Sequence, residues 1–218
     1  MHHAEDKMKK GFFITFEGLD GSGKTTQIKL LEEYIKSKGY EVVLTREPGG
    51  TDISEQIRTL ILDTANTRMA PITEMMLYSA ARAQLVAEVI KPAISNGKVV
   101  LCDRFVDSSY VYQGFGRGID LKIVHDVNKI ALNGIEPDIT FFFDIDPQNS
   151  LKRRFNATAG DRIESESIEF HTKVYNGYKK LSELYPERIK VIDCMRSIDE
   201  IFADLKKWID IMEINKRG

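Results

Sequence analysis

Residues 18–25, Gly18-Leu19-Asp20-Gly21-Ser22-Gly23-Lys24-Thr25, are the most informative stretch of this 218-residue chain. They match the phosphate-loop pattern G-x-x-x-x-G-K-[ST] at every fixed position, directly after an apolar run and directly before a helical pattern. Glycines let the backbone curl so that successive N–H groups point at phosphate oxygens, and the helix N-terminus adds partial positive charge. In this motif Lys24 reaches the β- and γ-phosphates and the Thr25 hydroxyl binds Mg²⁺. The stretch therefore predicts a nucleoside triphosphate site.

Apolar runs elsewhere in the chain predict the strands that accompany this loop. Five of them are continuously apolar rather than alternating, as buried parallel strands are: 12–16, 42–44, 99–102, 139–143 and 189–192. Helical patterns lie between them, and Ser197 with Glu200 forms a capping box that opens the last helix. Alternation of strand and helix produces crossover connections. We therefore predict an α/β P-loop fold of three layers, a five-stranded parallel sheet with helices on both faces, in one domain spanning residues 8–218.

Composition and charge limit the classes of partner and the compartment. Lys and Arg total 31 against 33 Asp and Glu, for a net charge of −2. Because the chain has no excess of basic residues, we do not expect a nucleic-acid partner. The two cysteines, Cys102 and Cys194, each end an apolar run, which is typical of buried reduced thiols in a cytoplasmic protein. No run approaches the ~20 apolar residues of a membrane span. The polar start is not a secretory signal, and we interpret residues 1–7 as an N-terminal extension.

A carboxylate near the phosphate loop is needed as a second Mg²⁺ ligand. Asp103 follows the run 99–102, at a strand end where ligands of open α/β sheets bind, and Arg104 comes next. Asp144 has the corresponding place after the run 139–143. We favour Asp103 because the adjacent arginine indicates a charged site rather than a simple strand end.

Further arginines predict a second anion site. Arg46 lies two residues after the second apolar run, 42–44, and Arg58 lies in the helical pattern that follows it. Arg82 comes four residues after Tyr78, so the two share one helix face and offer a ring and a guanidinium to a base and its phosphate. Taken alone, each arginine is better explained as a solvated surface residue or as an aliphatic stem that covers the core. Together with Arg104 they favour a site for a second phosphorylated compound.

A small, polar segment, 156–161, lies between two helical patterns and predicts a mobile lid at about 152–163. It is flanked by three arginines: Arg153, Arg154 and Arg162. The phosphate loop carries Gly21 where some related loops carry a basic residue, so the charge at the transferring phosphoryl group must come from elsewhere. We predict that a lid arginine supplies it, with Arg153 and Arg162 ahead of Arg154.

Three longer segments resemble the signature segments of bacterial thymidylate kinases, which are P-loop nucleoside monophosphate kinases. They are Phe16-Glu17-Gly18-Leu19-Asp20-Gly21-Ser22-Gly23-Lys24-Thr25-Thr26, Thr45-Arg46-Glu47-Pro48-Gly49-Gly50-Thr51 and Asp103-Arg104-Phe105. Tyr110-Val111-Tyr112-Gln113-Gly114 and Asp161-Arg162-Ile163-Glu164 also fit in order and spacing, so the resemblance covers nearly the whole chain. It implies transfer of the ATP γ-phosphate to dTMP, with Mg²⁺, giving dTDP and ADP on the way to dTTP. It also implies a homodimer.

The resemblance implies roles for the phosphate loop and for the phosphate of the substrate. The residues that bind ATP are Gly18, Leu19, Asp20, Gly21, Ser22, Gly23, Lys24, Thr25 and Thr26. Asp20 also accepts from the 3′-hydroxyl of the substrate sugar, and Arg104 grips its phosphate. Arg46, Pro48 and Arg58 complete that part of the substrate site.

For the base and sugar, the resemblance implies five further contacts. Tyr78 stacks on thymine, and Arg82 reaches a base carbonyl. Ser109 and Gln113 read the base edge. Tyr112 crowds the 2′ position of the sugar and so excludes ribonucleotides.

Three other functions remain open at the level of the sequence. Another P-loop kinase, acting on a nucleoside or on a different monophosphate, would share the loop but not the Arg-Glu-Pro-Gly-Gly-Thr segment. A GTP-dependent switch needs a guanine-reading Asn-Lys-x-Asp, and Asn128-Lys129-Ile130-Ala131 lacks the aspartate. A nucleotide-regulated scaffold would leave the arginines unexplained.

Overall fold

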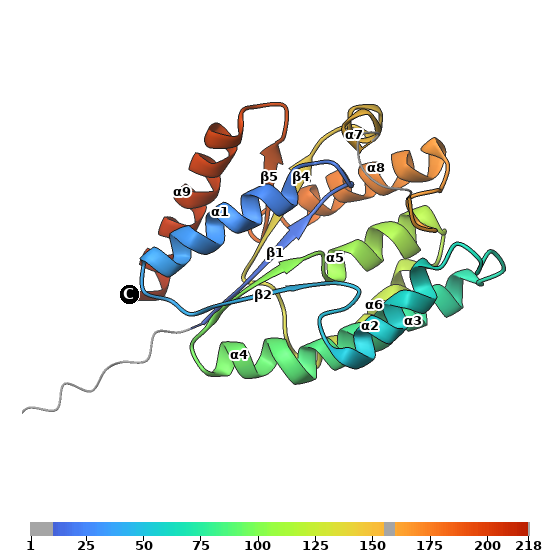
Figure 1. Ribbon diagram of the computed structural model, residues 1–218, viewed down its shortest axis with the longest axis horizontal. Coiled ribbons are helices and arrows are strands. Elements are labelled where there is room, and N and C mark those ends of the chain that lie inside the picture. The colour runs from blue at the N-terminus through green and yellow to red at the C-terminus, as the bar shows by residue number, and fades with distance from the viewer. Residues whose placement is uncertain (1–10, 155–159, 218) are drawn as a thin grey trace, which may run out of the picture.

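The computed structural model describes residues 11–154 and 160–217 of the chain. The predicted extension at 1–7 and part of the predicted lid, residues 155–159, lie outside the described residues. The strands are β1 (Phe12–Glu17), β2 (Val42–Arg46), β3 (Val99–Asp103), β4 (Ile139–Asp144) and β5 (Ile189–Asp193). They form one parallel sheet in the order β2-β3-β1-β4-β5 (Figure 1), which confirms the predicted fold class.

Helices connect the strands and cover both faces of the sheet. They are α1 (Lys24–Ser37), α2 (Asp52–Leu62), α3 (Pro71–Leu85), η1 (Val86–Ile90), α4 (Lys91–Ser95), α5 (Val106–Ser109), η2 (Tyr110–Gly116), α6 (Leu121–Leu132), α7 (Pro147–Arg154), α8 (Ile168–Leu184) and α9 (Ile198–Arg217). Helices α1 and α9 lie side by side on one face, while α3, α4, α6 and α8 belong to the other (Figure 1). No helix in the described ranges has the length and apolar character to cross a membrane.

Alternate residues of the central strand β1 face the two helical layers. Phe12, Ile14 and Phe16 pack with α1 and α9, whereas Phe13 packs with η1 and α4. Because side chains alternate along a strand and both faces are covered, every residue of β1 is buried. The apolar run thus fixes the middle of the sheet, and the phosphate loop leaves from its carboxyl end.

Two helix features have local causes. Pro92 has no N–H to donate, and the helix widens into the π turn η1 just before it, where the Lys91 N–H bonds to the Val86 carbonyl. The capping box predicted at Ser197 is present: the Ser197 N–H donates to Glu200 at 2.9 Å, and the Glu200 N–H donates to the Ser197 Oγ at 3.3 Å.

Candidate active site

The phosphate loop connects β1 to α1 through residues that require glycine. Gly18 has a φ of 134°, and a Cβ there would lie 2.6 Å from the carbonyl oxygen of Phe143. Gly23 caps α1 with a φ of 93° and has open space around it, so its conformation rather than its surroundings excludes a side chain. The loop therefore approaches β4 closely and presents the N-terminus of α1.

The side chain of Lys24 folds back into this loop. Its Nζ donates to the carbonyl oxygens of Gly18 at 3.1 Å and Leu19 at 3.0 Å, and the residue is only 6% exposed. Burial lowers the pKa of Lys24, as does the charge of Arg104, while Asp103 and Asp20 act in the opposite direction. The ammonium group thus lies where the phosphate loop would surround phosphate oxygens.

The residues predicted to hold Mg²⁺ suit that ion. The Oδ1 atom of Asp103 is buried and has no hydrogen-bond partner among residues 11–154 and 160–217, which is costly unless something else satisfies it. The rival Asp144 is a neighbour of Tyr175, and burial together with this carboxylate raises the pKa of Tyr175 to about 12. In the same ranges no three His, Cys, Asp or Glu side chains form a metal cage. Mg²⁺ needs no such cage, because it is usually held by one or two carboxylates together with waters and substrate phosphates.

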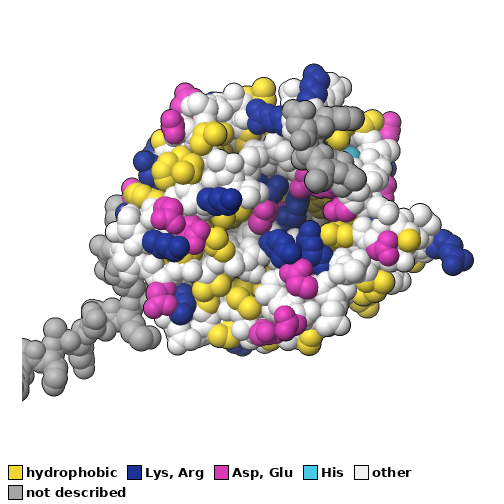
Figure 2. Space-filling model, in the orientation of Figure 1, with side chains coloured by type: hydrophobic (Ala, Val, Ile, Leu, Met, Phe, Trp, Pro, Cys, Tyr) yellow, Lys and Arg dark blue, Asp and Glu magenta, His cyan; other side chains and the backbone are white. Residues whose placement is uncertain are grey.

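A cavity opens beside the phosphate loop and gathers most of the predicted substrate residues. Those that line it are Asp20, Pro48, Arg58, Tyr78, Arg82, Arg104, Ser109, Tyr112 and Gln113. Figure 2 shows this region as a hollow in the middle of the visible face, with Lys or Arg side chains gathered in it. The cavity combines aromatic rings with guanidinium groups, as a site for a phosphorylated aromatic compound requires.

Arg104 lies between the phosphate loop and the cavity. Its backbone has a φ of 68°, an unusual conformation for a residue other than glycine. Two bonds to β1 hold it there: the Arg104 N–H donates to the Phe16 carbonyl at 2.9 Å, and the next N–H, of Phe105, donates to Glu17 at 2.8 Å. Its Nη2 lies 2.7 Å from the Asp20 Oδ1. Burial alone would lower the pKa of Arg104, but Asp20, Tyr112, Tyr178 and Asp103 together outweigh it and the pKa is raised.

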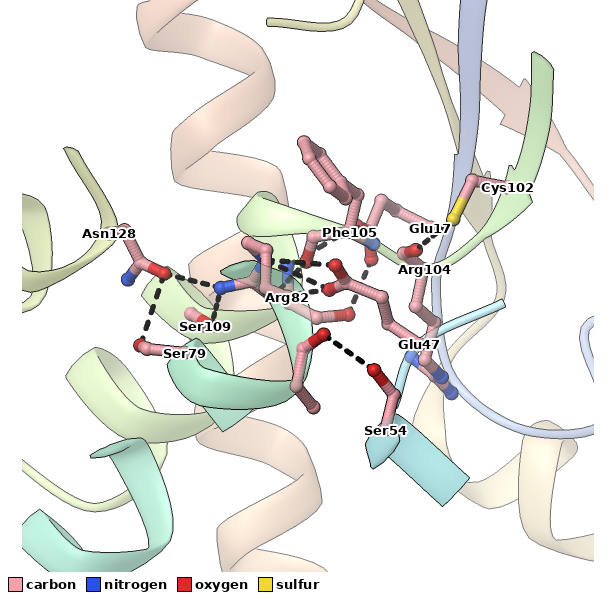
Figure 3. A network of polar contacts seen from close by, with 12 residues as sticks. Glu17, Glu47, Ser54, Ser79, Arg82, Cys102, Arg104, Phe105, Ser109 and Asn128 are labelled. Carbon is pink, nitrogen blue, oxygen red and sulfur yellow. Dashed lines mark hydrogen bonds and ion pairs between the residues drawn. The ribbon is translucent and has the colours of Figure 1, made fainter. Parts of the chain in front are cut away.

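Arg82 is fixed from every side (Figure 3). It is 1% exposed, and its Nε and Nη2 donate to the Glu47 carboxylate at 2.9 and 2.5 Å. Further donors reach Ser109 Oγ, the Phe105 carbonyl and Asn128 Oδ1. Burial raises the pKa of Glu47 to about 7, against the effect of the Arg82 charge. The guanidinium is thus a rigid part of the cavity wall.

Arg46 is the one predicted substrate residue that does not line the cavity. Its two Nη atoms donate to the Glu55 carboxylate at 2.7 and 3.0 Å, and the side chain is 46% exposed. The Glu55 Oε1 also accepts from the Gly50 N–H at 2.7 Å. A carboxylate on α2 therefore holds Arg46 against the outside of the loop that follows β2, and its contact with the substrate stays a prediction. Arg58 does line the cavity and donates to the Pro48 carbonyl at 2.9 Å.

Two of the three predicted lid arginines, Arg153 and Arg162, lie in different surroundings. The Arg153 Nη2 donates to the Cys194 carbonyl at 3.1 Å, beyond the end of β5, and its side chain is exposed. The Arg162 Nε donates to the Ile61 carbonyl at 2.7 Å, and its Nη2 lies 2.7 Å from the Glu74 Oε2. Arg162 is thus engaged by α2 and α3, and its catalytic contact stays a prediction. The Arg154 side chain lies outside the described part.

Buried carboxylates form a group of site residues that the sequence did not single out. Glu17 accepts from Ser108 Oγ at 2.6 Å and from the Tyr178 hydroxyl at 2.7 Å, in addition to the Phe105 N–H. Glu17 directly follows the predicted strand 12–16, as Asp103 follows 99–102, and Glu47 directly follows the observed strand β2. A position after a strand was therefore the feature of the sequence that could have indicated these site residues. Tyr178 lies on α8, and nothing in the neighbouring sequence marks it as a site residue.

Comparisons with known proteins point to a single family. The family model for thymidylate kinase matches residues 16–205. The chain is 52% identical over 204 residues to the thymidylate kinase of Thermoanaerobacter pseudethanolicus, covering 94% of this chain and 98% of the relative. It is 52% identical over 201 residues to that of Caldanaerobacter subterraneus, covering 92% and 96%. A crystal structure of thymidylate kinase from Ehrlichia chaffeensis aligns with a TM-score of 0.75 at 35% identity, covering 92% of this chain and 98% of the other.

Proposed function

The chain belongs to the thymidylate kinase family, and from that premise we propose that it transfers the γ-phosphate of ATP to dTMP, giving dTDP and ADP. It is a phosphotransferase that acts on small molecules. The single observation that carries the assignment of residues is the position of Arg104. It joins the phosphate loop, through Asp20, to a cavity whose remaining wall is suited to a base and a sugar phosphate.

On the donor side, the loop residues 18–26 bind the triphosphate through backbone N–H groups and Lys24. When phosphate oxygens enter the loop, they replace the backbone carbonyls that now accept from the Lys24 ammonium. Thr25 and Asp103 would hold Mg²⁺, which neutralises charge on the transferred phosphoryl group. The unsatisfied Oδ1 of Asp103 supports this assignment.

On the acceptor side, Arg104 binds the dTMP phosphate and Asp20 accepts from the sugar 3′-hydroxyl. Tyr78 stacks on the base, and Tyr112 occupies the space that a 2′-hydroxyl would need. The backbone bonds around Arg104 support its role, because a guanidinium held in place loses little entropy on binding. Arg58 and Pro48 complete the phosphate end of the cavity.

For the base, Arg82 directs positive charge at a carbonyl, while Ser109 and Gln113 line the same wall. Arg153 is the lid arginine best placed to act in catalysis, since its exposed side chain is tied by one backbone carbonyl and a weak sulfur contact. Arg162 instead acts by fixing the segment 160–166 to α3. A lid that closes with Arg153 would exclude water from the transferring group.

A homodimer is supported by apolar side chains left exposed on three helices that pack side by side, α2, α3 and α6. These residues are Ile53, Leu60, Ile72, Met76, Ile123 and Ile130, the last 81% exposed. Burying them against a second copy would remove apolar surface from water. Cys102 and Cys194 are buried free thiols, which supports a cytoplasmic location.

The test is product detection from ATP with each nucleoside monophosphate in turn. We expect ADP and a diphosphate to form fastest with dTMP, and an Arg104→Ala variant of unchanged secondary structure to lose this activity. Faster turnover of another monophosphate, or of a nucleoside, would overturn the assignment in favour of another P-loop kinase.

A further inference from the structure

A buried cluster around Glu74 lies behind the base end of the cavity. Glu74 is in the first turn of α3 and is 1% exposed. Its carboxylate accepts from Gln113 Nε2 at 3.0 Å and from Arg117 at 3.1 and 2.9 Å, and it lies 2.7 Å from the Arg162 guanidinium. Burial alone would raise the pKa of Glu74, but these donors outweigh it and the pKa is lowered. Glu74 is therefore an ionised acceptor surrounded by donors.

This contact determines which end of the Gln113 amide faces Glu74. An ionised carboxylate has no proton to donate, so only the amide –NH₂ group can bond to it. The amide is planar, and its oxygen and nitrogen point apart. Gln113 lines the cavity, and no described residue forms a hydrogen bond with its Oε1. The bond to Glu74 thus fixes the amide with its oxygen, an acceptor, turned away from Glu74 and available to the cavity.

The pattern of donors and acceptors on pyrimidine bases gives this orientation a consequence. Thymine carries a donor at N3 and an acceptor at O4, whereas cytosine carries an acceptor at N3 and a donor at N4. A fixed acceptor from Gln113, in the same cavity as the positive charge of Arg82, fits the first pattern and opposes the second. A buried site that leaves such groups unpaired rejects the wrong ligand strongly.

We propose that Glu74 is a positioning residue that sets base selectivity, by holding the Gln113 amide with its oxygen toward the base and so favouring thymine over cytosine. This inference rests on the proposed function, since it concerns the base of the dTMP substrate. Glu74 itself does not line the cavity and acts through Gln113.

The experiment measures kcat/KM for dTMP and for dCMP in the wild type and in Glu74→Gln. A glutamine at this position can accept from Gln113 or donate to it, so the amide is free to turn its –NH₂ toward N3 of cytosine. We expect the dTMP/dCMP ratio to fall on the order of ten-fold, the effect of one hydrogen-bond mismatch. The matched control is Glu166→Gln, which removes a carboxylate 2.5 Å from Arg117 but leaves the Gln113 contact in place. Its ratio should stay at the wild-type value.

A double-mutant cycle separates selectivity from stability. In a Gln113→Leu background the amide is gone, so adding Glu74→Gln should leave the dTMP/dCMP ratio unchanged. A purely structural role for Glu74 would lower activity with both nucleotides and leave the ratio alone in either background. If Glu74→Gln keeps the wild-type ratio, or lowers it equally in both backgrounds, the inference is wrong. If Glu74→Gln does not fold, Gln113→Leu alone must still lower the ratio, and an unchanged ratio there also overturns the inference. A wild type that prefers dCMP would instead overturn the proposed function.

Discussion

The substrate cavity and the phosphate loop are built on opposite plans. Three buried carboxylates support the cavity: Glu47 lines it, whereas Glu17 and Glu74 lie outside its lining. Glu17 and Glu74 accept hydrogen bonds from several neighbouring groups, and Glu47 accepts from the Arg82 guanidinium. The described contacts of the phosphate loop are of another kind: glycines shape it, and Lys24 bonds to its own backbone carbonyls. The acceptor side is therefore organised before substrate binds, whereas the donor side is completed by the nucleotide.

Physical costs explain why the two plans differ. A buried carboxylate without partners costs several kcal/mol, so each one is retained only where its hydrogen bonds are made. Such a residue fixes the side chains that donate to it, which suits a site that must distinguish similar bases. Backbone N–H groups cost little to present and recognise any phosphate, which suits a donor site.

The largest expected effect is on the donor side. Replacing Lys24 by Ala removes the positive charge that contacts the phosphates, so kcat should fall on the order of 10³-fold or more. The substitution removes no side-chain packing on which the sheet depends. The melting temperature should change little. The measurement is initial rate against ATP concentration, with circular dichroism as the folding control. Near-normal kcat in a folded variant would contradict the assigned role of the loop.

On the acceptor side, the largest effect should be on folding. Glu47→Ala leaves the Arg82 guanidinium buried without its main partner, which should cost about 3–5 kcal/mol of unfolding free energy at pH 8. Urea unfolding followed by circular dichroism measures it. A loss below about 1 kcal/mol would show that the cavity wall is not stabilised by this pair.

Arg153 and Arg162, two of the three arginines at the predicted lid, should have different kinetic effects, one on the donor side and one on the acceptor side. Arg153→Ala should lower kcat about 10²-fold with little change in the KM for ATP, because its contact forms mainly in the transition state. Arg162→Ala should instead raise the KM for dTMP and lower stability, since Arg162 is paired with Glu74. If Arg162→Ala lowers kcat as much as Arg153→Ala without affecting KM, both arginines act on the donor side.

Sequence patterns predicted the features that a few consecutive residues determine. The phosphate loop, the five apolar runs and the capping box at Ser197 are each encoded within a few consecutive residues. The partners of Arg46 and Arg162 were not predicted, because Glu55 and Glu74 meet them only after α2, α3 and the segment after 160 pack together. The same holds for the contact of Tyr178 with Glu17, which joins residues 161 positions apart.

The pH dependence of stability should reflect the acceptor side. Burial raises the pKa of Glu47 from 4.5 to about 7, so between these values the folded state binds more protons than the unfolded state. The unfolding free energy should therefore fall as pH rises through this window. Each kcal/mol lost should lower the melting temperature by about 2–4 °C, which is the quantity to measure. Glu47→Gln should flatten the slope between pH 5 and 8. Glu74→Gln should not, because the pKa of Glu74 is lowered and its titration lies below the window. Equal slopes for the wild type and Glu47→Gln would contradict this assignment.

The smallest effect should come from Arg46, the neighbour of Glu47 in the chain. Both residues form ion pairs, but the Arg46–Glu55 pair is 46% and 43% exposed, whereas the side chains of the Arg82–Glu47 pair are 1% and 4% exposed. An exposed pair is screened by water and salt, so Arg46→Ala should cost less than about 1 kcal/mol. Glu55 keeps its bond to the Gly50 N–H in this variant, so the loop should keep its shape. The KM for dTMP should consequently change by less than about five-fold, and the stability difference should shrink further at high salt. A much larger rise in KM, in a variant of wild-type stability, would mean that Arg46 leaves Glu55 and reaches the substrate phosphate, as its place in the sequence predicts.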